Sequence, residues 1–222
     1  MASYNKVRHL IHRDTDPYLG LELLPRFEWG FNSFHPIFKA IIDYCQPTLI
    51  VEVGSFVGES AIHMAKIVRN LGLDCEIVCV DTWCSYDWTE DSHYERHKFK
   101  NGRPMIYEQF MSNVVHEGME NIITPFPTDS VGARDFMKKY NIHPNVVYID
   151  AGHEKEECLR DIDIWYELLN RHGNSCIFGD DYGFPPHGVD RAVEEFKLLH
   201  KIFDHNLQIF GEKWLSVLTS NM

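Results

Sequence analysis

A short apolar run followed by two glycines constrains the fold of this chain more than any other feature. The run Leu49–Val53, which contains a single acid, Glu52, is typical of a strand buried on both faces of a sheet. Gly54 and Gly58 then allow a tight turn into a helix that we expect to begin near Glu59. Glycine at such a turn lets the backbone approach a ligand closely. The segment therefore predicts a strand, a turn beside a ligand, and a helix.

A second apolar run, residues 77–81, ends in Asp81. In a right-handed βαβ unit the two strands are neighbours, so the Asp81 carboxylate lies at the same sheet edge as the glycine turn. An acid at this position can bind both hydroxyls of a ribose. The spacing of Gly54 and Gly58 differs from the Gly-x-Gly-x-x-Gly pattern that admits a pyrophosphate. With Glu52 and Asp81 in register, we expect a ligand with a ribose and no pyrophosphate, in preference to a purely structural turn.

Strand and helix patterns alternate along the rest of the chain. The expected helices cover residues 34–44, 60–71, 105–117, 130–140, 154–170 and 189–201; the expected strands cover 49–53, 77–81, 122–126, 146–150 and 176–180, with two more in 207–218 joined at Gly211 and Glu212. This alternation predicts an open α/β fold with a mostly parallel seven-stranded sheet and helices on both faces. The C-terminal hairpin supplies an antiparallel strand at the edge of the sheet.

The length of 222 residues fits one domain, and 44% hydrophobic residues suffice for its core. We expect residues 1–47 to form an N-terminal segment and a helix that contribute to a substrate cleft. Residues 48–222 form the ligand-binding core, in which residues 82–104 are an inserted loop rich in Trp, Tyr and His.

The composition also narrows the partners and the compartment. The net charge of −12 disfavours a nucleic-acid partner. No apolar stretch is long enough to cross a membrane, and residues 1–10 lack the apolar core of a signal peptide, so we expect a soluble, cytoplasmic protein without a membrane partner. The six cysteines show no Cys-x-x-Cys spacing and are expected to be reduced. The sequence leaves open whether the protein forms a homo-oligomer.

Residues 52–60 (EVGSFVGES) and 79–83 (CVDTW) resemble motifs I and II of the class I S-adenosylmethionine (SAM)-dependent methyltransferases. Later segments match further motifs of that family: 148–153 (YIDAGH), 177–182 (IFGDDY) and 188–193 (GVDRAV). The pattern is most similar to the branch of cephalosporin-hydroxylase-like and macrolide-sugar O-methyltransferases, and it extends from about Trp29 onward. The resemblance implies a Rossmann-like methyltransferase fold. It also implies a SAM site made of Glu52, Gly54, Ser55, Gly58, Ser60, Asp81, Thr82, Trp83, Asp129, Ser130 and Asp150.

Three acids follow two of the predicted strands. Asp150 and Asp180 each end an apolar run, and Asp181 comes next, so their carboxylates converge at the ligand-binding edge of the sheet. Such carboxylates repel one another strongly unless a cation joins them, and hard oxygen ligands favour Mg²⁺, with Mn²⁺ as a substitute. The alternative is that the acids cap the following helices. The resembling O-methyltransferases hold a divalent metal at the corresponding acids.

His153 lies three residues after Asp150, and an imidazole there can act as a general base at neutral pH. The related sugar methyltransferases place a proposed catalytic His at the matching site, with Asp150 beside it. Asp129 and Ser130 follow the third strand, where the resembling enzymes contact adenine, although a helix cap explains them equally well. Several aromatic side chains flank the expected cleft: Trp29, Phe31, His35, Trp83, Trp88, His93 and Tyr94.

These features together predict a SAM-dependent, metal-dependent O-methyltransferase. The sequence has neither the Asn/Asp-Pro-Pro-Tyr/Phe motif of amino methyltransferases nor a cysteine placed as in cytosine methyltransferases. The expected acceptor is a hydroxyl group of a small molecule or glycan. We expect a sugar with vicinal hydroxyls, and a catechol is the alternative. Two other functions stay open: a nicotinamide (NAD)-dependent oxidoreductase, and a nucleoside-binding module without catalysis.

Overall fold

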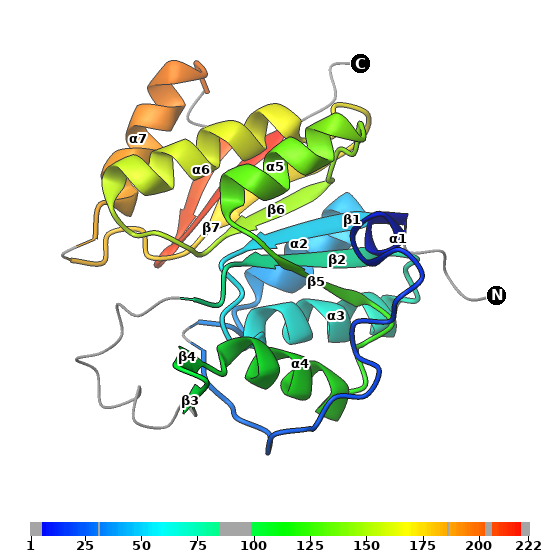
Figure 1. The fold of residues 1–222 in the computed structure, drawn as a ribbon. Helices are drawn as coiled ribbons and strands as arrows, with labels where there is room; N and C mark the ends of the chain where they lie inside the picture. The colour runs from blue at the N-terminus through cyan, green and yellow to red at the C-terminus, as the bar shows by residue number, and fades with distance from the viewer. Residues whose placement is uncertain (1–5, 31, 85–98, 186, 203–205, 219–222) are drawn as a thin grey trace.

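The buried strand β1 (Leu49–Val53) forms the centre of a seven-stranded sheet. The computed structural model describes residues 6–30, 32–84, 99–185, 187–202 and 206–218. The strand order is β5-β2-β1-β6-β7-β9-β8 (Figure 1). The other strands are β2 (Glu76–Asp81), β5 (Ile123–Pro127), β6 (Val146–Ile149), β7 (Ser175–Gly179), β8 (Leu207–Phe210) and β9 (Lys213–Leu218). The neighbours from β5 to β7 pair in parallel, and β9 pairs antiparallel with both β7 and β8.

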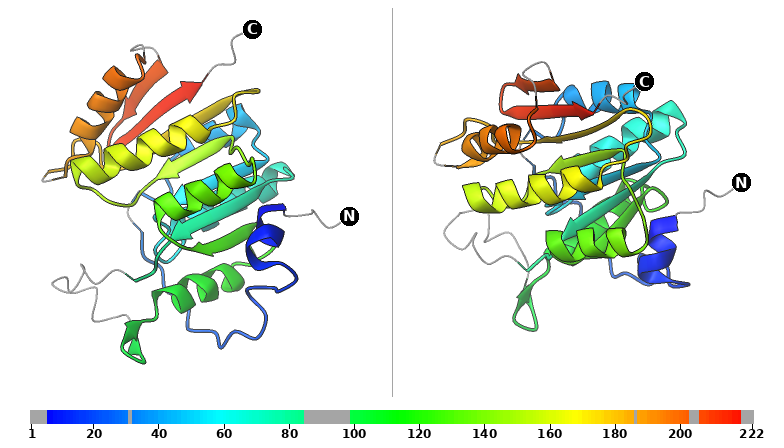
Figure 2. Two further views of the ribbon diagram at one scale, coloured as in Figure 1. Left: turned by 45° about the horizontal axis from the view of Figure 1, so that its top comes forward. Right: turned by 90° about the horizontal axis from the view of Figure 1, so that it is seen from above.

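Helices cover both faces of this sheet (Figure 2). One face carries α2 (Ile37–Cys45) and α3 (Glu59–Leu71), with α4 (Ile106–His116) beside α3; the other carries α5 (Ser130–Lys139), α6 (Lys155–Leu168) and α7 (Val189–Leu199). The short N-terminal helix α1 (Lys6–His12) contacts β2 and β5. A small separate hairpin consists of β3 (Phe99–Lys100) and β4 (Arg103–Pro104).

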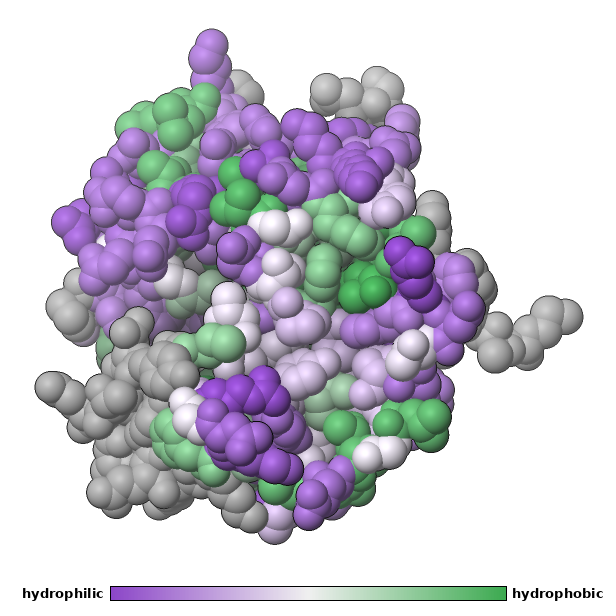
Figure 3. Space-filling view, viewed as in Figure 1, coloured by the Kyte–Doolittle hydropathy of each residue, from purple (hydrophilic) through white to green (hydrophobic). Residues whose placement is uncertain are grey.

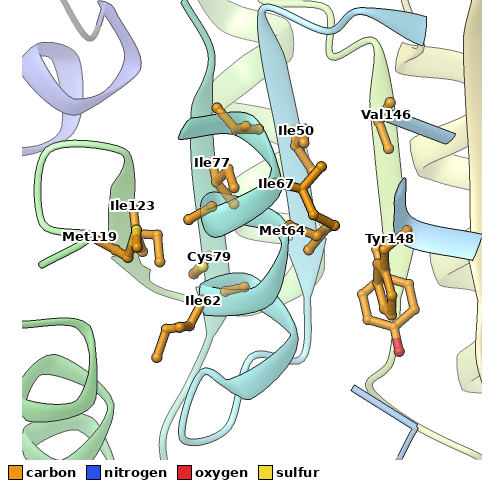
Figure 4. Close-up of a cluster of buried hydrophobic side chains, with 14 of the residues drawn as sticks. Ile50, Ile62, Met64, Ile67, Ile77, Cys79, Met119, Ile123, Val146 and Tyr148 are labelled. Atoms are coloured by element: carbon orange, nitrogen blue, oxygen red, sulfur yellow. The ribbon is translucent and has the colours of Figure 1, made fainter. Parts of the chain in front are cut away.

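Alternation of side chains along the strands divides the core into two layers. Ile50, Ile77, Val146 and Tyr148 pack toward α3, against side chains such as Met64 (Figure 4). Their neighbours in sequence pack toward α5, α6 and α7 on the opposite face: Val51, Val53, Val78, Val147, Ile149 and Ile177. Because the central strands are buried on both sides, they read as continuous apolar runs, and this is why the sequence predicts them well.

The predicted fold class is confirmed: a Rossmann-like, mostly parallel seven-stranded sheet with a C-terminal hairpin. Two details differ from the prediction. The helix expected to start at residue 34 begins at Ile37, after Pro36. The helix α1 was not predicted; its N-terminal turn is held by Glu76, whose carboxylate accepts hydrogen bonds from the backbone N–H groups of Val7 (3.1 Å) and Arg8 (2.8 Å).

The described surface is largely polar on the face shown in Figure 3, where apolar side chains are scattered in small areas. Among the described residues, no helix combines the length and apolarity needed to cross a membrane. All six cysteines are free thiols. Of the expected insertion 82–104, the structure describes Thr82 to Cys84 and the hairpin β3–β4; residues 85–98 lie outside the described part.

The structure explains the glycine at position 54 differently from the sequence. It has a φ of +89°, and a Cβ atom there would lie 1.9 Å from the backbone oxygen of Asp150. The glycine is therefore required by the close approach of the chain that follows β6, before any ligand is considered. Gly58, with φ also +89°, leaves room for the ring of Phe110, which a Cβ would meet at 2.9 Å.

We predict that Gly54→Ala lowers the free energy of unfolding by about 3 kcal/mol or more, because the positive φ and the collision with Asp150 act together. Gly72 is the matched control, since it has φ +66° and open space around it. Gly72→Ala should cost only about 1–2 kcal/mol. Urea denaturation measures both variants, and equal losses would contradict the explanation.

Candidate active site

The Asp81 carboxylate lies at the carboxyl end of β2, beside the turn that follows β1. Its Oδ2 accepts hydrogen bonds from the backbone N–H groups of Ser55 (3.0 Å) and Phe56 (2.8 Å), and its Oδ1 accepts one from Trp83 (2.7 Å). Burial raises the pKa of Asp81, and these three N–H groups oppose that rise. The structure thus brings Asp81 and the Gly54 turn together, and the carboxylate holds the turn after β1 to the loop after β2.

Glu52 and Ser60 lie beneath this turn, inside the core. Glu52 is fully buried, and its Oε1 accepts a hydrogen bond of 2.6 Å from the Ser60 hydroxyl. Burial raises the pKa of Glu52 to about 7, opposed by bonds from hydroxyl groups. Ser55 is also buried. The hydrogen bond between Glu52 and Ser60 joins β1 to α3, and the contact of these side chains with the cosubstrate stays a prediction.

Trp83 is also held in the core. Its side chain is 4% exposed, its indole N–H donates to the Phe56 carbonyl (2.7 Å), and its ring packs 4.9 Å from the rings of Tyr107 and Phe110. Trp83 therefore anchors the loop after β2 in the core. Thr82, one residue earlier, is exposed.

The segment after β5 caps helix α5, as one of the two interpretations of the sequence predicted. Asp129 is the N-cap of α5, where its Oδ1 accepts a hydrogen bond of 2.6 Å from the Gly132 N–H. Ser130 points inward, and its hydroxyl accepts a bond of 3.0 Å from the indole N–H of Trp165. Ser130 thus has a structural role, and Asp129 is exposed near the strand end; their contact with adenine stays a prediction.

A buried chain of hydrogen bonds joins the acids at the ends of β6 and β7. The ammonium of Lys213 lies 2.5 Å from Oδ2 of Asp180 and donates to the hydroxyl of Tyr148 at 2.8 Å. The Tyr148 hydroxyl donates in turn to Oδ2 of Asp150, at 2.9 Å. The side chains of Lys213 and Asp180 are 1% and 4% exposed. Lys213 is thus a cation within the group of acids for which the sequence predicted a metal.

The remaining charge of this group is negative. Burial, together with the charges of Asp180 and Asp181, raises the pKa of Asp150 to about 6, although the Lys213 charge lowers it. Oδ1 of Asp180 is buried and has no hydrogen-bond partner in the described part of the chain. A buried carboxylate oxygen without a partner is costly. The site therefore still has the electrostatic capacity for a further cation.

His153 pairs with Asp181 and not with Asp150. Its Nε2 lies 2.9 Å from Oδ2 of Asp181, and its ring stacks on that of His187 at 4.3 Å with an interplanar angle of 22°. Burial alone would lower the pKa of His153, but the hydrogen bond and charge of Asp181 raise it above the usual value. Asp181 has a φ of +61°, a strained conformation for a non-glycine residue, which aims its side chain at the two imidazoles.

A group of side chains around His153 could also hold a metal ion. Within the described residues, ligand atoms of His153, Asp181 and His187 all lie within 4.8 Å of one another. The predicted set of Asp150, Asp180 and Asp181 is not such a group, because Asp181 is turned toward His153. Of the three predicted ligands, the structure therefore brings Asp150 and Asp180 into one network and Asp181 into another.

Sequence reasoning missed three residues of this site: Tyr148, His187 and Lys213. Lys213 follows Gly211 and Glu212, so it reads as part of a polar turn, and only the pairing of β9 with β7 brings it next to Asp180. His187 lies in a Gly- and Pro-containing loop without periodicity. Tyr148 stands in the apolar run of β6, where an aromatic residue indicates core.

The predicted aromatic residues are only partly described. Trp29 stacks against Phe27 at 6.4 Å, in the segment before α2. His35 lines a groove of about 590 Å³ between α2 and the β8–β9 hairpin, away from the acids. Phe31, Trp88, His93 and Tyr94 lie outside the described residues.

Comparison with known proteins identifies the family. A methyltransferase domain family matches residues 51–182, which is more than half of the chain. The chain belongs to this methyltransferase family. The match includes both glycines of the β1 turn, Asp81, and all three acids at the ends of β6 and β7. The resemblance to class I SAM-dependent methyltransferases is confirmed. Among curated proteins, none matches this methyltransferase in sequence.

Solved structures share its fold. An O-methyltransferase from Bacillus cereus, in complex with SAH, matches with a TM-score of 0.57 at 12% identity, over 89% of this chain and 84% of that chain. The O-methyltransferase TomG from Streptomyces achromogenes, involved in tomaymycin synthesis and in complex with SAM, gives 0.58 and 12% over the same shares. CalS11, a TDP-rhamnose 3'-O-methyltransferase of calicheamicin biosynthesis, gives 0.57 and 15% over 83% and 76%.

We predict that Lys213→Met lowers the free energy of unfolding by about 3–5 kcal/mol, because it leaves the Asp180 carboxylate buried without its cation. The double variant Lys213→Met with Asp180→Asn removes both charges and should recover much of that loss. Chemical denaturation of the three proteins measures the coupling. Additive losses would show that the ion pair is not what holds the two strands.

Proposed function

We propose that this methyltransferase transfers the methyl group of SAM to a hydroxyl oxygen of a small-molecule or glycan acceptor. The acceptor that we propose within this class is a sugar with vicinal hydroxyls. The observation that carries the proposal is the His153–Asp181 pair, 2.9 Å apart, which follows β6, the neighbour of β1, and β7, the next strand. The named activities of the solved neighbours, including a sugar O-methyltransferase, support oxygen as the acceptor atom.

The donor side of the cleft would be formed by the turns after β1, β2 and β5. Its proposed contacts are the backbone at Gly54, Ser55 and Gly58, the carboxylate of Asp81, and exposed Thr82 and Asp129. A carboxylate has about four acceptor sites, and Asp81 uses three of them for backbone N–H groups. The Thr82 N–H also lowers the pKa of Asp81, so a ribose hydroxyl would bind Asp81 as the Ser55 and Phe56 N–H groups rearrange.

The His153–Asp181 pair would remove the acceptor proton. A carboxylate only accepts hydrogen bonds, so Nε2 of His153 carries the proton that faces Asp181, and Nδ1 holds the lone pair of the base. As the acceptor oxygen bonds to the methyl carbon, the carbon–sulfur bond of the sulfonium breaks and the hydroxyl proton passes to Nδ1. Asp181 then stabilises the imidazolium. Because the donor is already reactive, alignment and proton removal are the main tasks of the protein.

The residues present also fit a divalent cation, Mg²⁺ or Mn²⁺, although none is part of the structure. The buried Oδ1 of Asp180, which has no hydrogen-bond partner among the described residues, is the acceptor that a cation would satisfy. Asp150 and Asp180 would hold the cation. Asp181, the third ligand that the sequence predicts, would join them only by giving up its bond to His153. When bound, it would supply positive charge that orients two neighbouring acceptor oxygens and makes a hydroxyl more acidic.

The rival functions differ in their ligands. A catechol also offers two neighbouring oxygens and would use the same groups. An NAD-dependent oxidoreductase gives no role to Asp180 and Asp181, and the β1 turn lacks the glycine that admits a pyrophosphate. A binding module without catalysis would need no base such as the His153–Asp181 pair.

Labelled methyl transfer from SAM to a panel of glycosides and catechols, with Mg²⁺ present, tests the proposal directly. We expect label on glycosides with vicinal hydroxyls. Transfer only to catechols would replace the sugar assignment. Binding of SAM without transfer to any acceptor in the panel would contradict the proposed reaction and favour a binding module.

Asp81→Ala should weaken SAM binding at least tenfold, because charge-assisted hydrogen bonds of this kind contribute about 1.5–3 kcal/mol each. Isothermal titration calorimetry with SAM measures the change. Asp135→Ala is the control, since Asp135 is an exposed acid on α5. Unchanged affinity in a folded Asp81 variant would remove the ribose assignment.

Activity should stop after chelation and return with Mg²⁺. Asp180→Asn should abolish Mn²⁺ binding in calorimetry while SAM affinity is retained, whereas His187→Ala should leave Mn²⁺ affinity within about twofold. The opposite pattern would place the cation between His153, Asp181 and His187. Full turnover after exhaustive chelation would rule out the cation requirement.

His153→Ala should lower kcat by a factor of about 10²–10⁴ with little change in SAM affinity, because proton removal matters only in the reaction step. Asp181 raises the pKa of His153, so the imidazole stays protonated to higher pH than usual and the wild-type rate should rise with pH through that raised value. Steady-state rates across pH measure this. A variant that keeps both the rate and the pH profile would make His153 a structural residue.

A further inference from the structure

Two cysteines from different elements lie against each other beside α2. Cys45 is the last residue of α2, and Cys176 is the second residue of β7. Their sulfur atoms are 3.9 Å apart, although the two residues are 131 positions apart in the sequence. A disulfide has a sulfur–sulfur distance of about 2 Å, so the two atoms must approach by roughly 2 Å to form one. Because Cys176 is paired with strands on both sides, the end of α2 is the part that moves.

Both cysteines line the groove of about 590 Å³ between α2 and the β8–β9 hairpin. Cys45 is 8% exposed, and Cys176 beside it is 1% exposed. The groove therefore gives a molecule as small as a peroxide a route to the Cys45 sulfur. Its apolar walls, which include Ile41 and Leu215, favour a small neutral oxidant over a charged one such as glutathione disulfide.

The two thiols of this pair differ in acidity. A Cys45 thiolate accepts a hydrogen bond from the Cys176 thiol, which lowers the pKa of Cys45, although burial opposes this. Burial raises the pKa of Cys176, and it raises the pKa values of Cys75 and Cys158 to about 12. The thiolate is the form that attacks a peroxide, so Cys45 is the nucleophile of the pair and Cys176 is the thiol next to it.

We propose that Cys45 and Cys176 form an oxidative modification site, at which hydrogen peroxide converts the pair to a disulfide between α2 and β7. The Cys45 thiolate attacks one peroxide oxygen, the oxygen–oxygen bond breaks, and the hydroxide that leaves takes up the proton lost from Cys45, which becomes a sulfenic acid. The Cys176 sulfur then attacks the Cys45 sulfur, the sulfur–oxygen bond breaks, and water leaves with the proton of Cys176. In total, two thiols lose two hydrogen atoms, and one peroxide molecule is reduced to two water molecules.

This disulfide fastens α2 to the sheet. The ring of Phe38, in the middle of α2, lies 5.1 Å from the ring of Tyr148 and 5.5 Å from that of Phe178. A covalent bond that closes so long a loop of chain lowers the entropy of the unfolded state and thereby stabilises the folded one. Cys176 stands near the start of β7, whereas Asp180 follows its end. The modification therefore stabilises the fold without occupying the candidate active site.

The test treats reduced protein with hydrogen peroxide and locates the oxidised cysteines. The parent protein carries Cys84→Ser, because Cys84 is exposed and would otherwise react between molecules. Remaining thiols are blocked with N-ethylmaleimide before digestion and mass spectrometry. We expect a peptide pair linked through Cys45 and Cys176, formed at least about tenfold faster than the Cys158 thiol is lost. Urea denaturation should give the oxidised form a higher midpoint, and dithiothreitol should restore the midpoint of the reduced form.

Cys176→Ser, in the same parent protein, keeps the nucleophile and removes its partner. We expect dimedone to trap a sulfenic acid at Cys45 in this variant, with no disulfide and no rise of the urea midpoint. Cys158→Ser is the matched control and should behave as the parent does. The proposal is overturned if both thiols of the pair persist in the parent, if Cys158 is lost as fast as Cys45, or if Cys45 becomes a sulfinic acid without a link to Cys176. Mass spectrometry of the parent decides among these outcomes even where a variant does not fold.

Discussion

The ion pair between Lys213 and Asp180 is the interaction on which the arrangement of the site depends. Burying an ammonium costs several kcal/mol unless it is paired, so β9 can dock against β7 only in a register that places Lys213 beside Asp180. A slip of one residue would turn Lys213 and Leu215 together to the opposite face of the sheet. The pair thus joins the C-terminal hairpin to the parallel core and, through Tyr148, also fixes Asp150.

Backbone contacts connect the two sides of the cleft. The N–H of Gly54 donates to the Val80 carbonyl (2.9 Å), and the N–H of Asp150 donates to the Val53 carbonyl (2.8 Å). The backbone oxygen of Asp150 lies where a Cβ of residue 54 would be. The proposed donor side, on β1 and β2, and the proposed acceptor side, on β6 and β7, are therefore held at a fixed separation by atoms that no side-chain rotation moves. In-line transfer needs such a fixed distance.

The sequence was sufficient for the fold because its central strands are apolar on both faces and end in acids at one edge. It did not show how the motif side chains pack. Glu52, Ser60 and Trp83 occupy motif positions, yet their side chains point into the core, where they join neighbouring elements. Lys213 could not be recognised, because its role arises from a pairing between β7 and β9 that local pattern does not encode. The pairing of His153 with Asp181, next in sequence to Asp180, likewise depends on the positive φ of Asp181.

A crystal structure with S-adenosylhomocysteine tests the central claim most directly. The account predicts the adenosyl ribose at Asp81, the homocysteine backbone at the Gly54 turn, and the sulfur facing His153 across the ends of β1 and β6. Methyl transfer to an acceptor held by the acids requires that orientation. A nucleoside bound elsewhere, or with its sulfur directed away from His153 and Asp150, would contradict it.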